Sequence, residues 1–168
     1  MVLVIAEQRD GVLNKTSWET IVAAQQMGQP VQVAVAGVDL QAVAVELAAA
    51  DVEAVLTVEH PALSSYTPDG FVTAFAAVVA SEAPEYVLLS HTYQTREFAP
   101  RLAARLGRSL ITDCVATKTR EDRLTFVRPM FQGKFVADVA PTGPAPYFAS
   151  FQIGAFRPDA LSRRSSPA

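Results

Sequence analysis

The sequence has only one cysteine, Cys114, among its 168 residues. An internal disulfide is therefore excluded, which is typical of proteins from reducing compartments. Long apolar runs are missing as well, and none approaches the roughly 20 residues that a membrane-spanning helix needs. The first expected strand begins at Val2, which leaves no room for a secretory or transit peptide. We therefore expect a cytoplasmic protein that does not enter the membrane.

A basic excess is also absent. The net charge is -3 at pH 7 and the sequence pI is about 5.4, whereas domains that bind nucleic acid usually carry a strong basic patch. We expect no nucleic-acid partner. Half of the residues are hydrophobic, which is enough to form the core of one domain.

The common catalytic and phosphate-binding motifs do not occur. The first strand ends in Ala6-Glu7-Gln8-Arg9-Asp10-Gly11, without the G-x-G-x-x-G that binds a dinucleotide. The phosphate loop G-x-x-x-x-G-K-[ST] and the nucleophile motif G-x-S-x-G are absent too. His60 and His91 are the only histidines, and neither has a partner at the spacing of a helical metal site. The residues alone therefore predict neither a catalytic constellation nor a metal site.

What the sequence does contain is a regular alternation of strands and helices. Strands are expected at residues 2–6, 31–35, 54–58 and 86–90. A segment with helical spacing follows each strand, and these segments begin at the candidate caps Thr16, Asp39, Thr67 and Thr95. At the first of them, Thr16 and Glu19 fit a capping box. The alternation predicts an α/β fold of Rossmann-like type, in which helices flank both faces of a parallel sheet.

The pattern changes after Gly107. Strand-like segments follow one another at residues 110–118, 124–130, 134–140 and 147–153, joined by short turns with no room for a helix. We expect them to add antiparallel strands to the C-terminal end of the sheet. We place the domain at residues 1–156, and residues 157–168 are polar enough to predict a linker or a disordered tail.

The most polar loop after a parallel strand runs from Ser90 to Arg96. In doubly wound sheets, ligands bind at the carboxyl ends of the strands. His91, Thr92 and Thr95 are therefore candidates for holding an anion or a nucleotide. The alternative is that Thr95 only caps a helix and the rest of the loop is solvated.

The segment from Phe126 to Lys134 is the most distinctive. Pro129 cannot donate a ladder hydrogen bond, so the strand should lie at an edge or be bulged at that position. Arg128 could pair with a carboxylate or a phosphate, and a solvated arginine is an equally good interpretation.

Several motifs, taken in order, resemble electron transfer flavoprotein alpha subunits. The resemblance begins with the strand at 2–7 and the helix opening Ser17-Trp18-Glu19-Thr20. It continues with the helix at 95–107, which is similar to G-[RK]-[DE]-[LF]-x-P-R-[LV]-A-x-x-L-[GD], and with Thr112-Asp113-Cys114. The segment 128–134 matches R-P-[IVM]-[YF]-x-G-[NK]. Together the motifs cover roughly residues 1–158. Thr95 stands where the family often has glycine, and Lys134 stands where asparagine is common.

The resemblance implies a fold related to adenine-nucleotide hydrolases and a role as the first domain of an alpha subunit. Such a domain packs against a beta subunit that carries AMP in many members, while FAD lies in a second alpha-subunit domain. The chain itself would then hold no cofactor, and it would be a scaffold rather than an enzyme in electron transfer from dehydrogenases. The expected partner interface is Arg128, Pro129, Phe131, Gly133 and Lys134, and the isolated chain could form a homo-oligomer. The alternative is a free-standing adenine-nucleotide-binding protein of the same superfamily.

Overall fold

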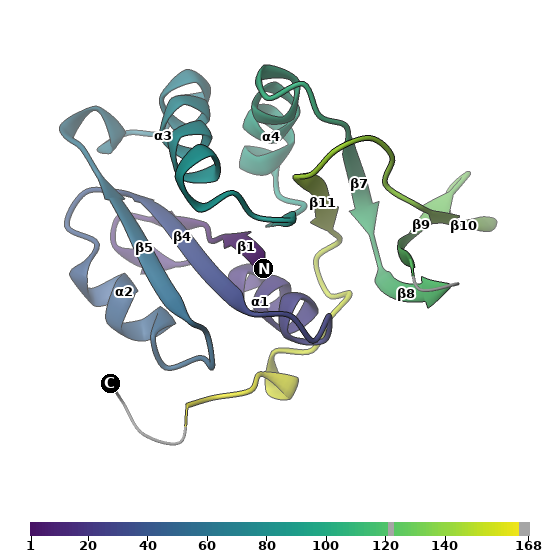
Figure 1. Cartoon of the computed structure of the whole chain (residues 1–168). Helices are drawn as coiled ribbons and strands as arrows, with labels where there is room; N and C mark the ends of the chain where they lie inside the picture. The colour runs from purple at the N-terminus through teal and green to yellow at the C-terminus, as the bar shows by residue number, and fades with distance from the viewer. Residues whose placement is uncertain (121–122, 165–168) are drawn as a thin grey trace.

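Six parallel strands form the central sheet of the computed structural model, which describes residues 1–120 and 123–164 (Figure 1). The strand order is β5-β4-β1-β6-β11-β7, and every neighbouring pair is parallel. The strands are β1 (Val2–Ile5), β4 (Val31–Gly37), β5 (Ala54–Glu59), β6 (Tyr86–Ser90), β7 (Leu110–Cys114) and β11 (Tyr147–Phe151). A two-strand hairpin, β2 (Gln8–Arg9) and β3 (Val12–Leu13), follows β1.

Helices cover both faces of this sheet, as the sequence predicts. The helices α1 (Thr16–Gln25) and α2 (Gln41–Leu47) contribute to one apolar core, and α3 (Pro68–Glu82) and α4 (Tyr93–Arg105) contribute to the other. The two pairs lie on opposite sides of the sheet in Figure 1. In β1, Val2 and Val4 belong to the first core whereas Leu3 and Ile5 belong to the second, because successive strand residues point to opposite faces. The fold class is therefore confirmed.

The strands after α4 divide between two sheets, which corrects part of the prediction. Only β8 (Ala116–Arg120), β9 (Arg123–Met130) and β10 (Phe135–Val139) form an antiparallel sheet, in the order β10-β9-β8. The first and last predicted segments supply β7 and β11, and β11 inserts between β6 and β7 as a parallel strand. The reason is burial, because Phe148 to Phe151 are all buried and such a strand belongs inside a sheet that is covered on both faces.

Of the four predicted helix caps, three differ from the prediction and one is confirmed. Thr67 caps α3 as predicted, with its Oγ1 accepting from Gly70 N at 3.3 Å. Thr16 does not cap α1, because its own backbone N–H donates to Asn14 Oδ1 at 3.1 Å. Glu19 does not reach back to the cap either, since its Oε2 accepts from Gly154 N at 2.6 Å. The contact of Glu19 with the chain after β11 therefore replaces the capping box.

The caps of α2 and α4 also differ from the prediction. Asp39 makes no cap, and the Leu40 N–H at the start of α2 donates to Glu59 Oε1 at 2.8 Å. In α4 the cap is Thr92, whose Oγ1 accepts from Thr95 N at 3.1 Å. The helix therefore begins one turn earlier than the sequence suggests.

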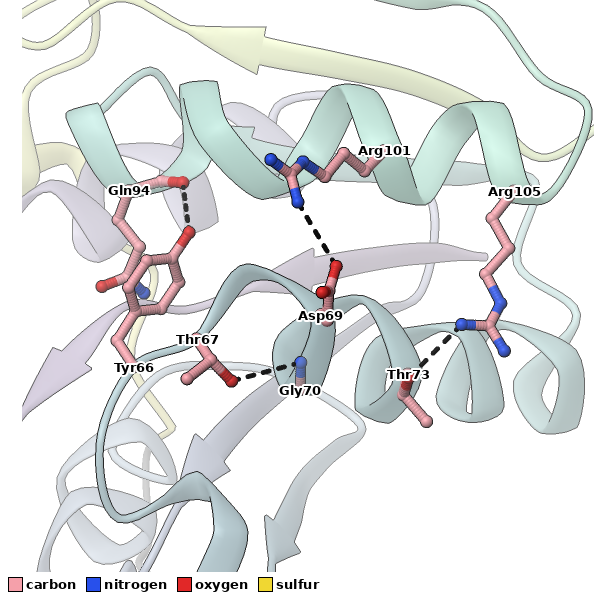
Figure 2. Close-up of polar contacts among 8 residues, drawn as sticks. All are labelled: Tyr66, Thr67, Asp69, Gly70, Thr73, Gln94, Arg101 and Arg105. Carbon is pink, nitrogen blue, oxygen red and sulfur yellow. Dashed lines mark hydrogen bonds and ion pairs between the residues drawn. The ribbon is translucent and has the colours of Figure 1, made fainter.

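The helices α3 and α4 pack against each other through stacked aromatic rings and a polar rim. The rings of Phe75 and Phe98 stack with centroids 5.8 Å apart. On the rim, Arg101 Nη1 lies 3.3 Å from Asp69 Oδ1, and Arg105 Nη1 donates to Thr73 Oγ1 at 3.3 Å (Figure 2). The Tyr66 hydroxyl donates to the Gln94 carbonyl at 3.3 Å in the same view. The rim arginines of α4 thus point to α3.

The described part of the C-terminal segment, residues 157–164, lies along α1 and the connection between α2 and β5. It contains a short 3-10 helix, η2 (Pro158–Ala160). Gln25 forms two hydrogen bonds with the Ser162 backbone, one donated to the carbonyl at 3.0 Å and one accepted from the N–H at 2.9 Å. Leu161 packs against the first core. The boundary at residue 156 and the linker role of 157–168 stay predictions, and residues 165–168 lie outside the described part.

Candidate functional site

The candidate site lies where the strand order reverses. The chain runs from β1 outward to β4 and β5, and it then crosses back to β6 on the other side of β1. In open α/β sheets, ligands bind outside the carboxyl ends of the strands at this switch point. Glu7 follows β1 there, and His91 and Thr92 follow β6. The crevice measures about 640 Å³ and is lined by Glu7, Arg9, Asn14, His91, Thr92, Tyr93, Gln94, Arg96, Asp113, Gln152 and Ile153.

Polar side chains of this crevice donate hydrogen bonds to a carboxylate of the protein, that of Glu7. Glu7 Oε2 accepts from the Thr92 hydroxyl at 2.5 Å, and Glu7 Oε1 accepts from Asn14 Nδ2 at 2.8 Å. The same Thr92 hydroxyl oxygen also caps α4. A phosphate placed at this point would meet a negative charge of the protein itself. The missing glycine motif and the Glu7 contacts thus both disfavour a phosphate group beside Glu7.

His91 is held beside this crevice by groups from two strands. Its Nδ1 lies 2.9 Å from Ser150 Oγ in β11, and its Nε2 lies 4.0 Å from Asp113 Oδ1 in β7. Burial lowers the pKa of His91, Asp113 opposes that shift, and Arg96 and Arg128 lower the pKa further. The imidazole is therefore neutral at pH 7, when its Nδ1 can accept or donate according to the tautomer.

A second cavity brings together two segments that the sequence analysis treats separately. It measures about 320 Å³ and is lined by His91, Thr95, Arg96, Pro100, Leu110, Thr112, Asp113, Arg128 and Ser150. His91 and Thr95 come from the polar loop, and Arg128 comes from the Arg-Pro segment. Thr92, the third candidate of the loop, contacts Glu7 instead. The insertion of β11 between β6 and β7 creates this neighbourhood.

Asp113 reaches the cavity through an irregularity in β7. Its φ is +61°, in the left-handed region, and the pairing of β7 with β11 shifts register at this point. Asp113 N donates to Ser150 Oγ at 3.3 Å. Bulges of this kind redirect a side chain and occur next to functional sites. The neighbouring Cys114 is buried, and burial raises the pKa of its thiol to about 12, so it is a small core residue rather than a nucleophile.

The predicted interface residues fall into two groups. Arg128 and Pro129 are half-buried in β9, where the pairing with β8 has ended at Val127, so Pro129 lies at a local edge as predicted. Phe131, Gly133 and Lys134 are exposed in the turn between β9 and β10. The exposed fractions of the nearby apolar residues are 72% for Phe131, 67% for Phe135 and 60% for Val136. The turn therefore presents apolar side chains to solvent.

Sequence reasoning missed several residues of the site. Arg96, Asn14 and Ser150 are not among the candidates predicted from the sequence, and neither are Glu7 and Asp113. Glu7 could have been found, because it directly follows the first strand. Asp113 and Ser150 could not, since their neighbourhood depends on the position of β11.

In residues 1–120 and 123–164, no group of three or more His, Cys, Asp or Glu side chains could hold a metal ion. Within the same residues, no helix is long and apolar enough to span a membrane.

The fold and the site define a Rossmann-like α/β domain with a carboxylate at its switch point and an added antiparallel sheet. The family model for the electron transfer flavoprotein domain matches residues 2–168, and the chain belongs to this family.

Curated relatives carry names from the same family. The chain is similar to the electron transfer flavoprotein subunit alpha of Bacillus subtilis, with 34% identity over 146 residues, 85% of this chain and 45% of the relative. It is 31% identical over 140 residues to the protein of the same name from Syntrophomonas wolfei, covering 83% of this chain and 44% of the relative. The acryloyl-CoA reductase electron transfer subunit beta of Anaerotignum propionicum is 34% identical over 115 residues, 66% of this chain and 31% of the relative. The chain thus spans a little under half the length of the two alpha subunits.

Proposed function

We propose that this chain acts as the N-terminal domain of an electron transfer flavoprotein alpha subunit. In this role it pairs with a beta subunit and supports a separate FAD domain that takes electrons from dehydrogenases. It is a scaffold and carrier part, not an enzyme, and it works in the cytoplasm. The observation that carries the proposal is the exposed aromatic turn between β9 and β10, in a chain of this family.

The turn has the properties of a contact surface. The rings of Phe131 and Phe135 meet edge to face with centroids 6.0 Å apart, and both are largely exposed. Phe131 and Gln132 have φ values of +50° and +60°, in the left-handed region, a strained conformation that often marks functional sites. Aromatic residues are enriched in protein interfaces, where they bury large areas. We therefore place Phe131, Gly133 and Lys134 in the contact with the beta subunit, with Arg128 and Pro129 behind them.

The direct test is complex formation. The purified chain is mixed with an electron transfer flavoprotein beta subunit, and the masses are measured by gel filtration with light scattering. We expect a peak with the mass of one copy of each chain. The chain alone should gain mass as its concentration rises, because the turn then contacts a second copy. Separate elution of the two proteins at micromolar concentrations would contradict the proposal.

The cofactors belong to other parts of the complex in this account. FAD would bind in the second alpha-subunit domain, and AMP would bind in the beta subunit. Glu7 supports this assignment, because its carboxylate already takes the Thr92 hydroxyl and the Asn14 amide at the switch point. We expect the purified chain to be colourless after gel filtration and to show no micromolar binding of AMP by calorimetry. A persistent flavin absorbance would overturn the first expectation, and an AMP isotherm would overturn the second.

The alternative function is a free-standing adenine-nucleotide-binding protein. The observation that favours it is the crevice of about 640 Å³ at the switch point, with Arg9 and Arg96 among its lining residues. Titrations with AMP and ATP distinguish the two functions. Tight nucleotide binding without a beta subunit would favour the alternative.

A further inference from the structure

We propose that the cavity between α4, β7, β9 and β11 is a binding site for a small oxyanion of the phosphate and sulfate class. The cavity is the one of about 320 Å³ that contains His91, Arg96, Asp113, Arg128 and Ser150. The proposal goes beyond pairing with a beta subunit and stands independently of it.

The charges around the cavity favour an anion. Arg96 and Arg128 carry permanent positive charges, and Asp113 contributes one carboxylate. Among the described residues, neither arginine forms an ion pair with a carboxylate, and Arg96 lies over the Tyr93 ring at 5.7 Å. Other arginines on the same or adjacent elements do, since Arg101 pairs with Asp69 and Arg120 pairs with Asp138. The cavity therefore has guanidinium groups without an anionic partner.

Arg128 also has a buried donor atom without an acceptor. Its Nε is buried and has no hydrogen-bond partner in residues 1–120 and 123–164. A buried N–H without an acceptor costs about 1–3 kcal/mol, and an acceptor with negative charge gives the strongest bond. An oxyanion in the cavity would supply such an acceptor once the Arg128 side chain turns, because Nε itself is buried.

The remaining lining groups suit a small ion rather than a large ligand. Thr95, Thr112 and Ser150 bring hydroxyl groups to the cavity wall, and hydroxyl groups can donate to oxyanions. The volume of about 320 Å³ lies at the lower limit of the range of ligand pockets. It accommodates one phosphate or sulfate ion with its water molecules.

Binding should be coupled to a proton on His91. The imidazole faces Ser150 of β11, Asp113 of β7, Arg96 of α4 and Arg128 of β9, and Glu7 and Arg9 line the adjoining crevice. In the unliganded protein, burial and the two arginines lower the pKa of His91. An anion beside the ring raises that pKa, so bound protein takes up a proton. The affinity for sulfate should therefore rise as the pH falls from about 7 to about 5.5.

The test is calorimetric titration of the purified chain with sulfate and with inorganic phosphate, at constant ionic strength in chloride. Sulfate is the main probe because its charge does not change in this pH range. We expect saturable binding of one ion. Arg96→Gln and Arg128→Gln should each weaken it about tenfold, the loss expected for one charge-assisted hydrogen bond. The matched controls are Arg101→Gln on α4 and Arg123→Gln on β9, which should change the affinity less than twofold.

The outcomes separate the proposal from its alternatives. Binding that does not saturate, or that falls equally in all four variants, overturns the site. If Arg128→Gln does not fold, Arg96→Gln and Arg101→Gln form a sufficient pair, because both lie on the same helix. AMP that binds no tighter than phosphate supports a free ion. AMP that binds more tightly, and loses affinity in the same two variants, supports the cavity as a phosphate site but overturns the expectation that the chain binds no nucleotide.

Discussion

At the scale of single residues, two carboxylates decide what the carboxyl edge of the sheet can hold. Glu7 fills the switch point through its bonds to Thr92 and Asn14. Asp113 stands in a bulge of β7 beside His91. Glu7 lines the larger crevice together with Arg9 and Arg96, whereas Asp113 lines both cavities. The smaller cavity therefore sets two guanidinium groups, Arg96 and Arg128, against the single carboxylate of Asp113.

His91 should make folding stability depend on pH. Its folded pKa is lowered from the ordinary value of about 6.5, so the unfolded chain binds more protons between the two values. The favourable contribution is complete above about pH 6.5 and is lost as the pH falls through the folded pKa. His91→Asn keeps a polar atom near the position of Nδ1 and removes this titration. Urea unfolding from about pH 7 to about pH 5 should therefore show a smaller loss of stability in His91→Asn than in the parent. Parallel curves for the two proteins would contradict the shift.

At the scale of elements, most helices and strands could be predicted from local pattern. Thr67 is a correct cap because Thr-Pro before a helical repeat fixes the start of α3 locally. Thr16 is not a correct cap, because Thr16 contacts Asn14 and Glu19 contacts Gly154. Sequence spacing cannot show such contacts. The position of β11 was beyond prediction for the same reason, since a short Pro/Gly connection fits a hairpin as well as a return to the parallel sheet. The cavity could not be predicted from the sequence either, because it is β11 that brings Ser150 to His91.

The cap of α4 provides a test of the element boundaries. Thr92→Val removes the oxygen that accepts from Thr95 N and donates to Glu7, so we expect a loss of about 1–2 kcal/mol in the free energy of unfolding. Thr95→Val preserves the size of a buried side chain whose hydroxyl makes no cap, and it should cost less. Urea denaturation of both variants measures the difference. A larger loss of unfolding free energy in Thr95→Val than in Thr92→Val would indicate that Thr95 is the cap, as the sequence suggests.

The segment after β11 can be tested through Gln25. Its side chain forms two hydrogen bonds with the Ser162 backbone, so Gln25→Ala should free the neighbouring chain. Trypsin cleavage after Arg163 should become about tenfold faster, because local opening costs less by the net value of these bonds. Gln26→Ala, at an exposed residue that directly follows the helix, is the control. Equal cleavage rates in the two variants would show that Gln25 does not hold the segment.

At the scale of the whole molecule, the domain separates a closed core from an exposed apolar turn. The parallel sheet buries both faces under α1, α2, α3 and α4, whereas the antiparallel sheet ends in the exposed turn with Phe131 and Phe135. This division suits a scaffold, because binding at the turn leaves the core unchanged. The family match over residues 2–168 agrees with a scaffold within an electron transfer flavoprotein subunit.

The most direct measurement is the affinity of the chain for a beta subunit when the turn is altered. Phe131→Ser with Phe135→Ser should weaken binding by about 100-fold or more, since buried aromatic anchors are worth about 2 kcal/mol or more each. The control is Val12→Ser with Val45→Ser, two other exposed apolar residues, with exposed fractions of 70% and 63%, outside the turn. The account predicts that the control binds like the parent and that both double variants melt at the parent temperature. Parent-like binding by the Phe131 and Phe135 variant would contradict the claim that this chain is a scaffold that pairs through its β9–β10 turn.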